Sequence, residues 1–335
     1  MTDPPRPPPV DLVLLALAVV AVSTSAPLIR GAEAPTLAIA FWRTILALPV
    51  TGGVLLLRGA GRAGRPRQPG LGDLDALARR RSVAAGLFLA AHFATWVPSL
   101  SFTSVASSVA LVSSTPIWSA LLARHRGQPV TARTWRGIAV ALGGVVLLTG
   151  VDLTVTPRAL FGDALALAGG ILAAFYLEAG AEVRRETSTA VYTTVCYSVA
   201  AAALLAVCLV ARQPLGGYDG ETWLLLGAIT LGPQLLGHTV VNRVLRTTSP
   251  TLVSVAILGE IVFAALLAWA FFDEVPPAAA IPAAVLLAVG VVTVVRAGGS
   301  AAAATAGRRD QDDHEDHADD HQDRGDDAAD AAGLN

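Results

Sequence analysis

The feature that most constrains the fold of this chain is a series of long apolar stretches. A transmembrane α-helix needs about 20 consecutive, mostly apolar residues to cross the hydrocarbon core of a bilayer. The stretches are continuous rather than alternating, which favours helices over the strands of a membrane barrel. Ten of them follow one another, at residues 11–29, 35–57, 82–101, 105–123, 137–151, 162–183, 190–211, 221–242, 250–272 and 277–295. The sequence therefore predicts an all-α integral membrane protein with ten transmembrane helices.

The composition supports a membrane protein and excludes several functional classes. Hydrophobic residues make up 53% of the chain and charged residues 15%, which is too apolar for a soluble protein of 335 residues. All 24 basic residues are arginine, so the chain has neither a phosphate-binding P-loop lysine nor a lysine for a Schiff base. Cys196 and Cys208 fall within one predicted helix, which implies no disulfide framework. We expect no cofactor, and no ATP-driven transport by this chain alone.

Arginine is distributed unevenly between the two ends of the predicted helices. If both termini are cytoplasmic, the inner segments hold 20 arginines and the outer loops hold three, Arg30, Arg158 and Arg212. Cytoplasmic loops of membrane proteins carry such an excess of positive charge. We therefore expect a multi-pass protein of the plasma (inner) membrane with both termini in the cytoplasm. A cleaved signal peptide ending near residues 32–34 is the alternative for the first stretch, but only one arginine, Arg6, precedes it.

Three segments outside the apolar stretches have distinctive compositions. Residues 1–10 are rich in proline and are expected to form a disordered N-terminus. Residues 58–81 are expected to form a basic cytoplasmic linker, since they hold seven arginines. Residues 297–335 hold 11 acids against three arginines, a net charge of −8, so the rest of the chain carries +6.

The acidic, His/Asp-rich composition of residues 297–335 predicts a disordered cytoplasmic tail, because such a segment cannot bury a core. His314, His317 and His321 would fall near one face of a helix, so a metal site in the tail is an alternative. A solvated acidic tail is the interpretation that we favour. We expect no metal site in the membrane-spanning part.

The chain repeats itself weakly at a spacing of about 145 residues. Because the matching residues keep their register across two stretches and a loop, we interpret residues 11–151 and 162–296 as two copies of a five-helix unit. An odd number of spans per copy places the copies in opposite orientations, as in many secondary transporters, which bind substrate at the midplane between the halves. The matches are Leu100, Thr103, Ser104 and residues 120–123 with Leu245, Thr248, Ser249 and residues 265–268, and, with one inserted residue, residues 144–146 with residues 290–292.

Several short motifs resemble one family of membrane proteins. They are AFWRTILA in the second stretch, the pair STPIWSALLARHRGQPVT and LGEIVFAALLAWAFFDEVPP, and GIAVALGGVVLL. Over residues 11–296 the chain looks like the EamA-type members of the drug/metabolite transporter superfamily. The resemblance implies a ten-helix, inverted-repeat carrier that moves small metabolites, commonly amino acids or related compounds and often outward, from a central cavity. Gln128 departs from the family's acidic residue after the fourth helix, whereas Glu274 in the second copy matches it.

Glu260 is the first candidate for a functional residue. It lies about ten residues into the ninth stretch, hence about 15 Å deep and close to the midplane. Placing a charged side chain at the centre of the bilayer costs at least ~2.5 kcal/mol, so an acid within a membrane helix is by default interpreted as a functional residue. We interpret Glu260 as a carboxylate that couples transport to protons or binds a substrate amine; a protonated or hydrogen-bonded structural acid is the alternative. In the first copy the corresponding residue is Thr115.

Other polar residues of the predicted helices are candidates for the substrate or proton pathway. His92 near the middle of the third stretch is either a proton relay or an interhelical hydrogen-bonding group, and Trp96 one turn later is a candidate for stacking on a ligand. Gln234, His238 and Asn242 share one helix face at i, i+4 spacing, which predicts that they line a wet cavity or a partner helix.

Charged residues near the helix ends have competing interpretations. Arg43 either clamps a substrate carboxylate or pairs with an acid to hold the second helix. Glu178 and Glu182, close to Arg184 and Arg185, are expected to form a charge cluster at the interface. Glu178 is also a candidate for lining the pathway, with Tyr176. The glycine pairs at residues 52–53, 143–144 and 169–170 are predicted to be sites of close helix packing.

The sequence thus predicts a secondary transporter and not an enzyme. It is expected to move a small metabolite by alternating access, with protons as the coupling ion and with efflux as the direction. A passive channel is the main alternative, and a membrane enzyme is disfavoured because no catalytic or metal-spaced cluster lies within the spans. The expected partners are a small-molecule substrate, protons and the lipid bilayer, without nucleic acid; a homodimer is left open.

Overall fold

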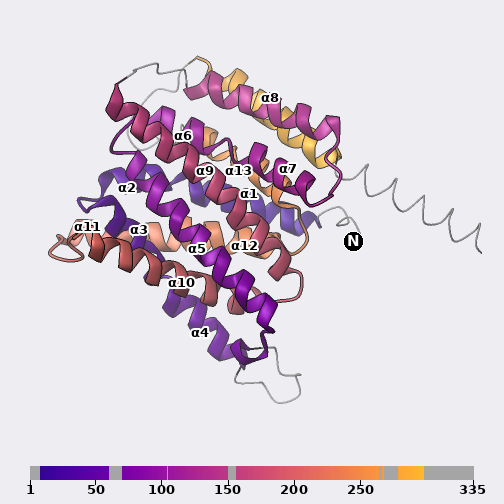
Figure 1. The fold of residues 1–335 in the computed structure, drawn as a ribbon. Coiled ribbons are helices and arrows are strands. Elements are labelled where there is room, and N and C mark those ends of the chain that lie inside the picture. Colours follow the sequence, from indigo (N-terminus) through magenta and orange to yellow (C-terminus); the bar gives the residue numbers. More distant parts are fainter. Residues whose placement is uncertain are drawn as a thin grey trace, which may run out of the picture.

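A computed structural model describes residues 8–59, 70–103, 105–149, 156–263, 266–267 and 278–297. Within these residues the chain is built of helices and connecting turns, with no strand (Figure 1). Seven of the described helices are long and apolar enough to cross a membrane. The chain is therefore an all-helical, multi-pass membrane protein. The histidines of the expected tail (His314, His317 and His321), Glu274 and most of residues 1–10 lie outside the described residues.

The helices of the first half begin and end within a few residues of the predicted stretches, except at the third. They are α1 (Pro9–Ser23), α2 (Ser25–Gly31), α3 (Thr36–Ile45), α4 (Leu48–Gly59), the short 3₁₀ turn η1 (Leu71–Asp73), α5 (Ala76–Ser99), α6 (Val105–Val112), α7 (Thr115–His125) and α8 (Ala132–Thr149). Helix α5 begins six residues before the expected position, because the Asp75 carboxylate accepts a hydrogen bond from the Ala78 N–H at 2.6 Å and caps the helix. Residues 76–81 therefore belong to a helix and not to the predicted linker.

The second half has longer uninterrupted helices. They are α9 (Pro157–Arg184), α10 (Thr189–Val210), α11 (Gly220–Ile229), the π-helical segment η2 (Thr230–Thr239), α12 (Val240–Val244), α13 (Pro250–Ile257) and a C-terminal helix, Ala280–Ala297. Segments α11, η2 and α12 form one continuous span, Gly220–Val244. Pro233 lies inside η2, where it lacks the N–H of a regular ladder, and the i→i+5 pattern surrounds it.

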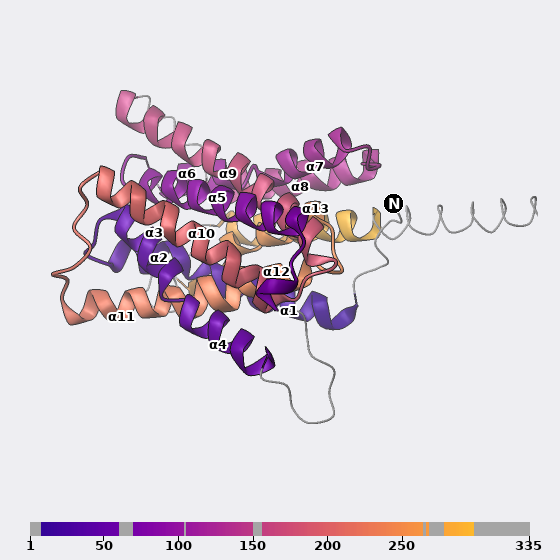
Figure 2. The same cartoon turned by 60° about the horizontal axis from the view of Figure 1, so that its bottom comes forward.

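Helix α9 runs through the centre of the bundle and packs along α5, with α6, α7, α12 and α13 also in contact (Figure 2). On the other side of α5, helix α10 packs against α5, α3 and α4. The close approach of α9 depends on glycine. A Cβ at Gly169 would lie 2.9 Å from the Cβ of Trp96, and one at Gly170 would lie 2.8 Å from the carbonyl oxygen of Val112. These two glycines therefore let α5 and α6 reach the backbone of α9.

Helix α8 lies beside the C-terminal helix, again through glycines (Figure 1). A Cβ at Gly144 would be 2.8 Å from the carbonyl oxygen of Ala283, and one at Gly290 would be 2.7 Å from that of Gly137. The prediction of close-packing glycines is thus confirmed for Gly144 and for residues 169–170. It is wrong for residues 52–53 and Gly143, where an added Cβ would meet no described atom within 4 Å.

Two helical segments, α6–α7 and the one that begins with α13, are kinked at positions 145 residues apart. Between α6 and α7, the N–H of Ser114 bonds to Leu111 O at 3.1 Å, three residues back instead of four. After α13, the N–H of Gly259 bonds to Ala256 O at 3.0 Å in the same way, and the helix resumes at Glu260. The two kinks are 145 residues apart, which is the spacing of the sequence repeat.

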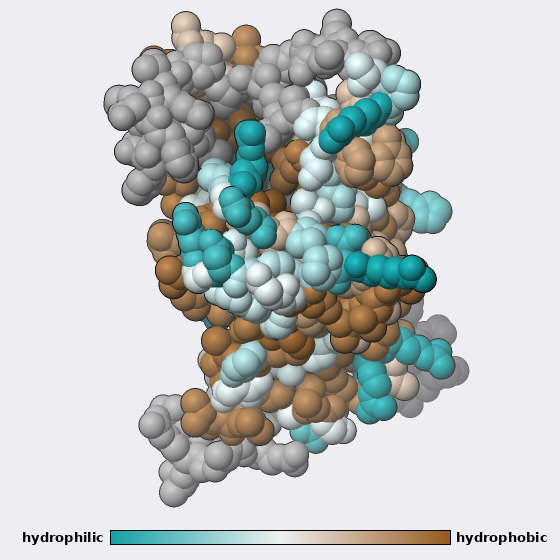
Figure 3. Space-filling model, turned by 90° about the vertical axis from the view of Figure 1, so that its left-hand side faces the viewer, coloured by the Kyte–Doolittle hydropathy of each residue, from teal (hydrophilic) through white to brown (hydrophobic). Residues whose placement is uncertain are grey.

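The surface fits a bilayer along its sides and water at its ends. Large apolar side chains such as Leu57, Val210, Leu224 and Ile281 are more than three-quarters exposed. Figure 3, which views the end of the bundle at the left of Figure 1, shows hydrophilic side chains gathered on that end and hydrophobic ones along the flanks. An apolar flank of this kind is the expected lipid-facing surface.

Candidate functional site

A cavity of about 80 Å³ lies where the two kinked spans meet α5, α9 and η2. A buried water needs about 10–15 Å³ of such space, so the cavity has room for a few water molecules in this conformation. Five of the predicted pathway residues line it, together with Thr115 and Ser25. The five are His92, Trp96, Tyr176, His238 and Glu260. We call this space the central cavity.

Glu260 is the only acidic residue among those that line the central cavity. It is the first residue after the kink at residues 258–259, and its carboxylate forms no hydrogen bond or ion pair with the described residues. Thr115 holds the same position after the other kink. Its hydroxyl donates to Val112 O at 2.7 Å and to Gly170 O at 3.1 Å. The two corresponding residues thus face one cavity, one fully engaged with backbone and the other unpaired.

His92 is fixed by the backbone of α9. Its Nδ1 lies 2.9 Å from the carbonyl oxygen of Gly169. Because a carbonyl only accepts, Nδ1 carries the hydrogen and Nε2 of the neutral ring is left as an acceptor. The ring is parallel to that of Trp96, with centroids 5.8 Å apart. The indole Nε1 of Trp96 is buried and has no hydrogen-bond partner among the described residues, which leaves it available to a ligand in the cavity.

Arg43 lies one layer behind the central cavity. Its Nε donates to Gln234 Oε1 at 3.0 Å, its Nη1 donates to Ser25 Oγ at 3.3 Å, and its guanidinium carbon lies 4.3 Å from the centre of the Phe93 ring. The side chain is 1% exposed and Nη2 has no partner among the described residues. No acid among the described residues is in contact with Arg43; its described partners are an amide, a hydroxyl and an aromatic ring.

Gln234, His238 and Asn242 all face the protein interior, but they do different things. Gln234 engages Arg43 as described above. His238 lines the central cavity, with its ring edge-on to Phe93 at 5.2 Å. Asn242 Nδ2 donates to the hydroxyl of Tyr176 at 2.7 Å, and Tyr176 itself lines the cavity. Asn242 therefore holds a cavity-lining group in place from behind, and Gln234 holds Arg43, which in turn donates to the lining residue Ser25.

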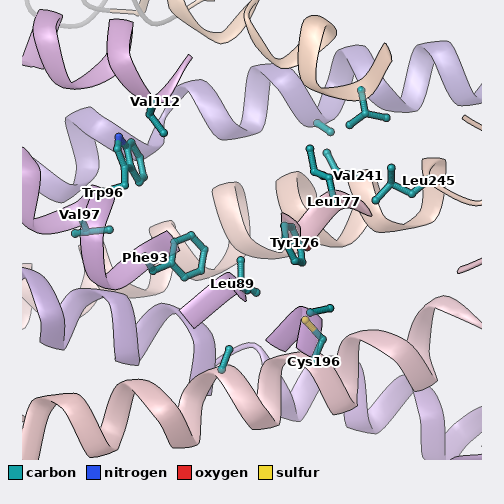
Figure 4. Close-up of a cluster of buried hydrophobic side chains, with 14 of the residues drawn as sticks. Leu89, Phe93, Trp96, Val97, Val112, Tyr176, Leu177, Cys196, Val241 and Leu245 are labelled. Atoms are coloured by element: carbon teal, nitrogen blue, oxygen red, sulfur yellow. The ribbon is translucent and has the colours of Figure 1, made fainter. Parts of the chain in front are cut away.

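A second, larger hollow of about 500 Å³ opens at the end of the bundle where α7, α9 and the C-terminal helix end. We call it the basic vestibule. Its wall consists of Ala123, residues 126–131, Thr134, Glu178, residues 181–182, Arg185, residues 245–246, residues 248–252, Val294 and Ala297. No described residue lines both spaces. Leu177 and Val241 on the cavity side and Leu245 on the vestibule side lie together beside Tyr176, so about one helical turn of apolar side chains separates them (Figure 4).

Glu178 and Glu182 form a charge cluster in which the charge of the expected Arg185 acts on Glu178, but the ion pairs come from other arginines than the sequence predicts. Glu182 pairs with Arg126 and, at 2.8 Å, with Arg81; Glu178 lies 3.6 Å from Arg126. The expected partner Arg184 is instead 1% exposed and donates to Asn242 O at 2.7 Å and to Thr189 Oγ1 at 2.5 Å. The difference arises because Arg184 points along α9 toward α12, whereas Glu182 faces α5 and α7.

Comparison with known proteins bears on the identity of this bundle. The sequence model of the EamA-like transporter family matches residues 11–150 and 160–296. The chain belongs to this family. No curated protein matches the sequence. A solved structure titled only "Crystal structure of protein" is similar to this EamA-like chain with a TM-score of 0.68 and 20% identity, over 85% of this chain and 96% of that one. At that identity the likeness shows a shared fold alone.

The sequence did not single out every residue of the EamA-like site. Ser25 accepts a hydrogen bond from Arg43, and the Phe93 ring lies beside the Arg43 guanidinium. Both residues lie in apolar helices, where a serine or a phenylalanine does not indicate a functional site. The sequence indicates Arg126 and Arg81 only as members of basic segments and does not predict their ion pairs with α9. Their pairing with α9 depends on how α5, α7 and α9 pack, which sequence spacing does not encode.

Proposed function

We propose that this EamA-like protein is a secondary carrier that moves a small metabolite, such as an amino acid or a related compound, across the plasma membrane. The central cavity is exposed alternately to each side, and Glu260 carries the coupling proton. The observation that supports this most is an unpaired carboxylate in a cavity between two corresponding kinks. Broken helices that meet at a midplane site are typical of secondary transporters.

The inverted repeat that such a mechanism requires has support in the packing. With the inserted residue, a shift of 146 brings Gly137 onto Ala283 and Gly144 onto Gly290. Gly144 meets Ala283, and Gly290 meets Gly137, so the two contacts exchange under the shift. A reciprocal contact of this kind is what a two-fold axis between two similar units produces. The two matched ranges of the family model, 11–150 and 160–296, also follow the proposed copies.

Ten spans with both termini cytoplasmic fit this arrangement. Three further spans complete the seven candidate helices: the kinked pair α6 and α7, helix α8, and the span that begins with α13. The arginine-rich end, which holds the basic vestibule, is then the cytoplasmic end. For efflux the substrate would enter through this vestibule, pass the apolar layer at Leu177 and reach the central cavity.

The cavity residues then have distinct tasks. Glu260 takes up and releases the proton, because an acid without a partner among the described residues, in a largely apolar cavity, changes its charge state when a ligand or more water arrives. His92 offers Nε2 as an acceptor, and Trp96 offers a ring face and an N–H. Gln234, Asn242 and Arg43 position the lining groups, and Glu178 stands at the vestibule beside Arg126.

The test is transport by the purified protein in proteoliposomes across an imposed pH gradient. Substitution Glu260→Gln is expected to abolish gradient-driven transport while leaving folding and counterflow of labelled substrate intact. Full gradient-driven transport by Glu260→Gln would remove the proton role. A wild-type protein without counterflow, but with gradient-independent flux, would indicate a passive channel.

A further inference from the structure

The basic vestibule contains more positive charge than its own acids neutralise. Glu178 and Glu182 are already engaged with Arg126, and Glu182 with Arg81 as well. Arg185 and Arg246 also line the vestibule, are exposed, and form no ion pair with any residue that the structure describes. Arg185 acts on Glu178 through its charge without forming an ion pair, and Arg246 has no ion pair with a described residue, so the vestibule lining keeps an excess of positive charge that favours an anionic occupant.

The backbone adds to this preference. Helix α13 begins in the vestibule wall, where Ser249 caps the helix by accepting from the Leu252 N–H at 3.2 Å. Its N-terminus carries partial positive charge. Beside it, the hydroxyl of Thr248 is buried, with the residue 5% exposed, and has no hydrogen-bond partner among the described residues. A hydroxyl, a helix start and two arginines thus belong to one wall.

The chain itself supplies a segment of opposite charge at this point. The C-terminal helix ends at Ala297, which lines the vestibule. Residues 298–335 follow directly, with 11 acids and three arginines. The first acid is Asp310, so residues 298–309 act as a tether that spans at most about 40 Å. A short tether holds its end at an effective concentration on the order of millimolar, which makes even weak ion pairs effective.

We propose that the acidic segment 310–330 of this chain docks in the basic vestibule, with its carboxylates on Arg185 and Arg246 and at the start of α13. Docking covers the arginine-rich mouth of the bundle. The proposal concerns contacts within the chain, and it stands or falls independently of proton coupling and of the substrate.

The test is photo-cross-linking in the full-length protein in nanodiscs. Gln128, a partly exposed residue of the vestibule wall, is replaced by p-benzoylphenylalanine, and the cross-linked peptides are identified by mass spectrometry. We expect cross-links to residues 310–330 at 0.15 M salt. They should diminish at 1 M salt, because the Debye length falls from about 8 Å to about 3 Å.

Two double variants that remove the same charge from different places distinguish docking of the tail in the vestibule from a general attraction between the tail and a basic surface. Arg185→Gln/Arg246→Gln is expected to lower the ratio of docked to undocked tail roughly two- to thirtyfold, the combined effect of two exposed ion pairs. Arg133→Gln/Arg136→Gln removes the same charge from exposed positions on α8 that do not line the vestibule, and should leave the cross-links unchanged. An equal loss in both variants, or none in the first, would overturn the proposal.

The lipid composition gives a second test. Nanodiscs of phosphatidylcholine alone are compared with nanodiscs that contain one-third phosphatidylglycerol. Tail cross-links in both membranes support the proposal. Their replacement by lipid cross-links when phosphatidylglycerol is present would show that an anionic headgroup, and not the tail, occupies the vestibule.

Discussion

The kink between α6 and α7 and the kink after α13 share a tightened backbone hydrogen bond and differ in their side chains. In each, the helix tightens to a three-residue hydrogen bond at the same point, Ser114 to Leu111 in one and Gly259 to Ala256 in the other. The next residue is Thr115 in the first kink and Glu260 in the second. At the first kink, the hydroxyl of Thr115 donates hydrogen bonds to the carbonyl oxygens of Val112 and Gly170. At the second kink, the carboxylate of Glu260 has no partner among the described residues.

The difference separates scaffold from function. A feature shared by both kinks, the bend itself, belongs to the architecture of the bundle. The carboxylate is present in only one of them and has no partner among the described residues, so we propose that it serves transport and not the architecture. The two kinks also depend on different residues: Pro116 follows the first bend, whereas Gly259 forms part of the second.

Exchanging the side chains of residues 115 and 260 should give the largest effect, a loss of transport driven by the pH gradient. In Thr115→Glu/Glu260→Thr, gradient-driven transport is expected to fall to the level of protein-free liposomes. The acid would then face the carbonyl oxygens of Val112 and Gly170, which an ionised carboxylate, an acceptor only, cannot satisfy. Uptake across a pH gradient measures the effect, with Glu260→Thr as the control. Full coupling in the exchanged protein would mean that the kinks are interchangeable.

Adding a methyl group beside each kink should show how differently they are packed. Gly170→Ala places a Cβ 2.8 Å from Val112 O and is expected to destabilise the protein by about 1–3 kcal/mol. Gly259→Ala meets Ala256 O at 3.2 Å and Val19 Cγ1 at 3.3 Å, and should cost less than about 1 kcal/mol. Unfolding in mixed micelles with increasing SDS measures both.

Gly143→Ala is the control for this pair, because an added Cβ there meets no described atom within 4 Å. It should be neutral or stabilise the helix by up to about 1 kcal/mol. Equal losses of stability for Gly170→Ala and Gly259→Ala would show that the two kinks are packed alike.

Removing the Thr115 hydroxyl should affect stability and not coupling. Thr115→Val loses the hydrogen bonds to Val112 O and Gly170 O, which is expected to cost about 1 kcal/mol. Thr115→Ser keeps the hydroxyl and should lose less. The same SDS titration and the uptake assay measure the two quantities. A loss of coupling in Thr115→Val with normal stability would assign the first kink a task in transport.

Pro116→Ala should give the smallest effect, within about 0.5 kcal/mol of wild-type stability. The substitution restores an N–H opposite Val112 O, but that oxygen already accepts from the Thr115 hydroxyl, so little is gained. Thermal unfolding in detergent measures the change. A large stabilisation would show that the proline holds the first kink bent against the preference of the helix.

The apolar pattern of the sequence predicts the helices well and their bends poorly. Helix α10, observed at Thr189–Val210, was expected at residues 190–211. A kink leaves hydropathy unchanged, so it is invisible to that pattern. Prolines are an incomplete guide, because Pro116 follows a kink, Pro98 lies one residue before the end of α5, and the kink at residues 258–259 contains none.

The sequence also predicts which side chains turn inward better than it predicts their partners. The cost of exposing polar groups to lipid is enough to place His92, Tyr176 and Asn242 in the interior. It does not tell which interior group each will meet. Glu182 with Arg126, and Arg43 with Gln234, join helices far apart in the chain, and such pairs follow only from the packing of whole helices.

The π-helical segment η2 sets a limit on how the span Gly220–Val244 can move. A π-helix holds a surplus residue relative to an α-helix, and each residue of an α-helix corresponds to a rotation of about 100°. If η2 tightened to an α-helix, the residues that follow it in the span would rotate together about the helix axis by about 100°. Gln234 could not then stay on Arg43 while Asn242 stayed on Tyr176. The hydrogen bonds of Gln234 and Asn242 therefore hold this span in its π-helical form, and any tightening of η2 must break at least one of them.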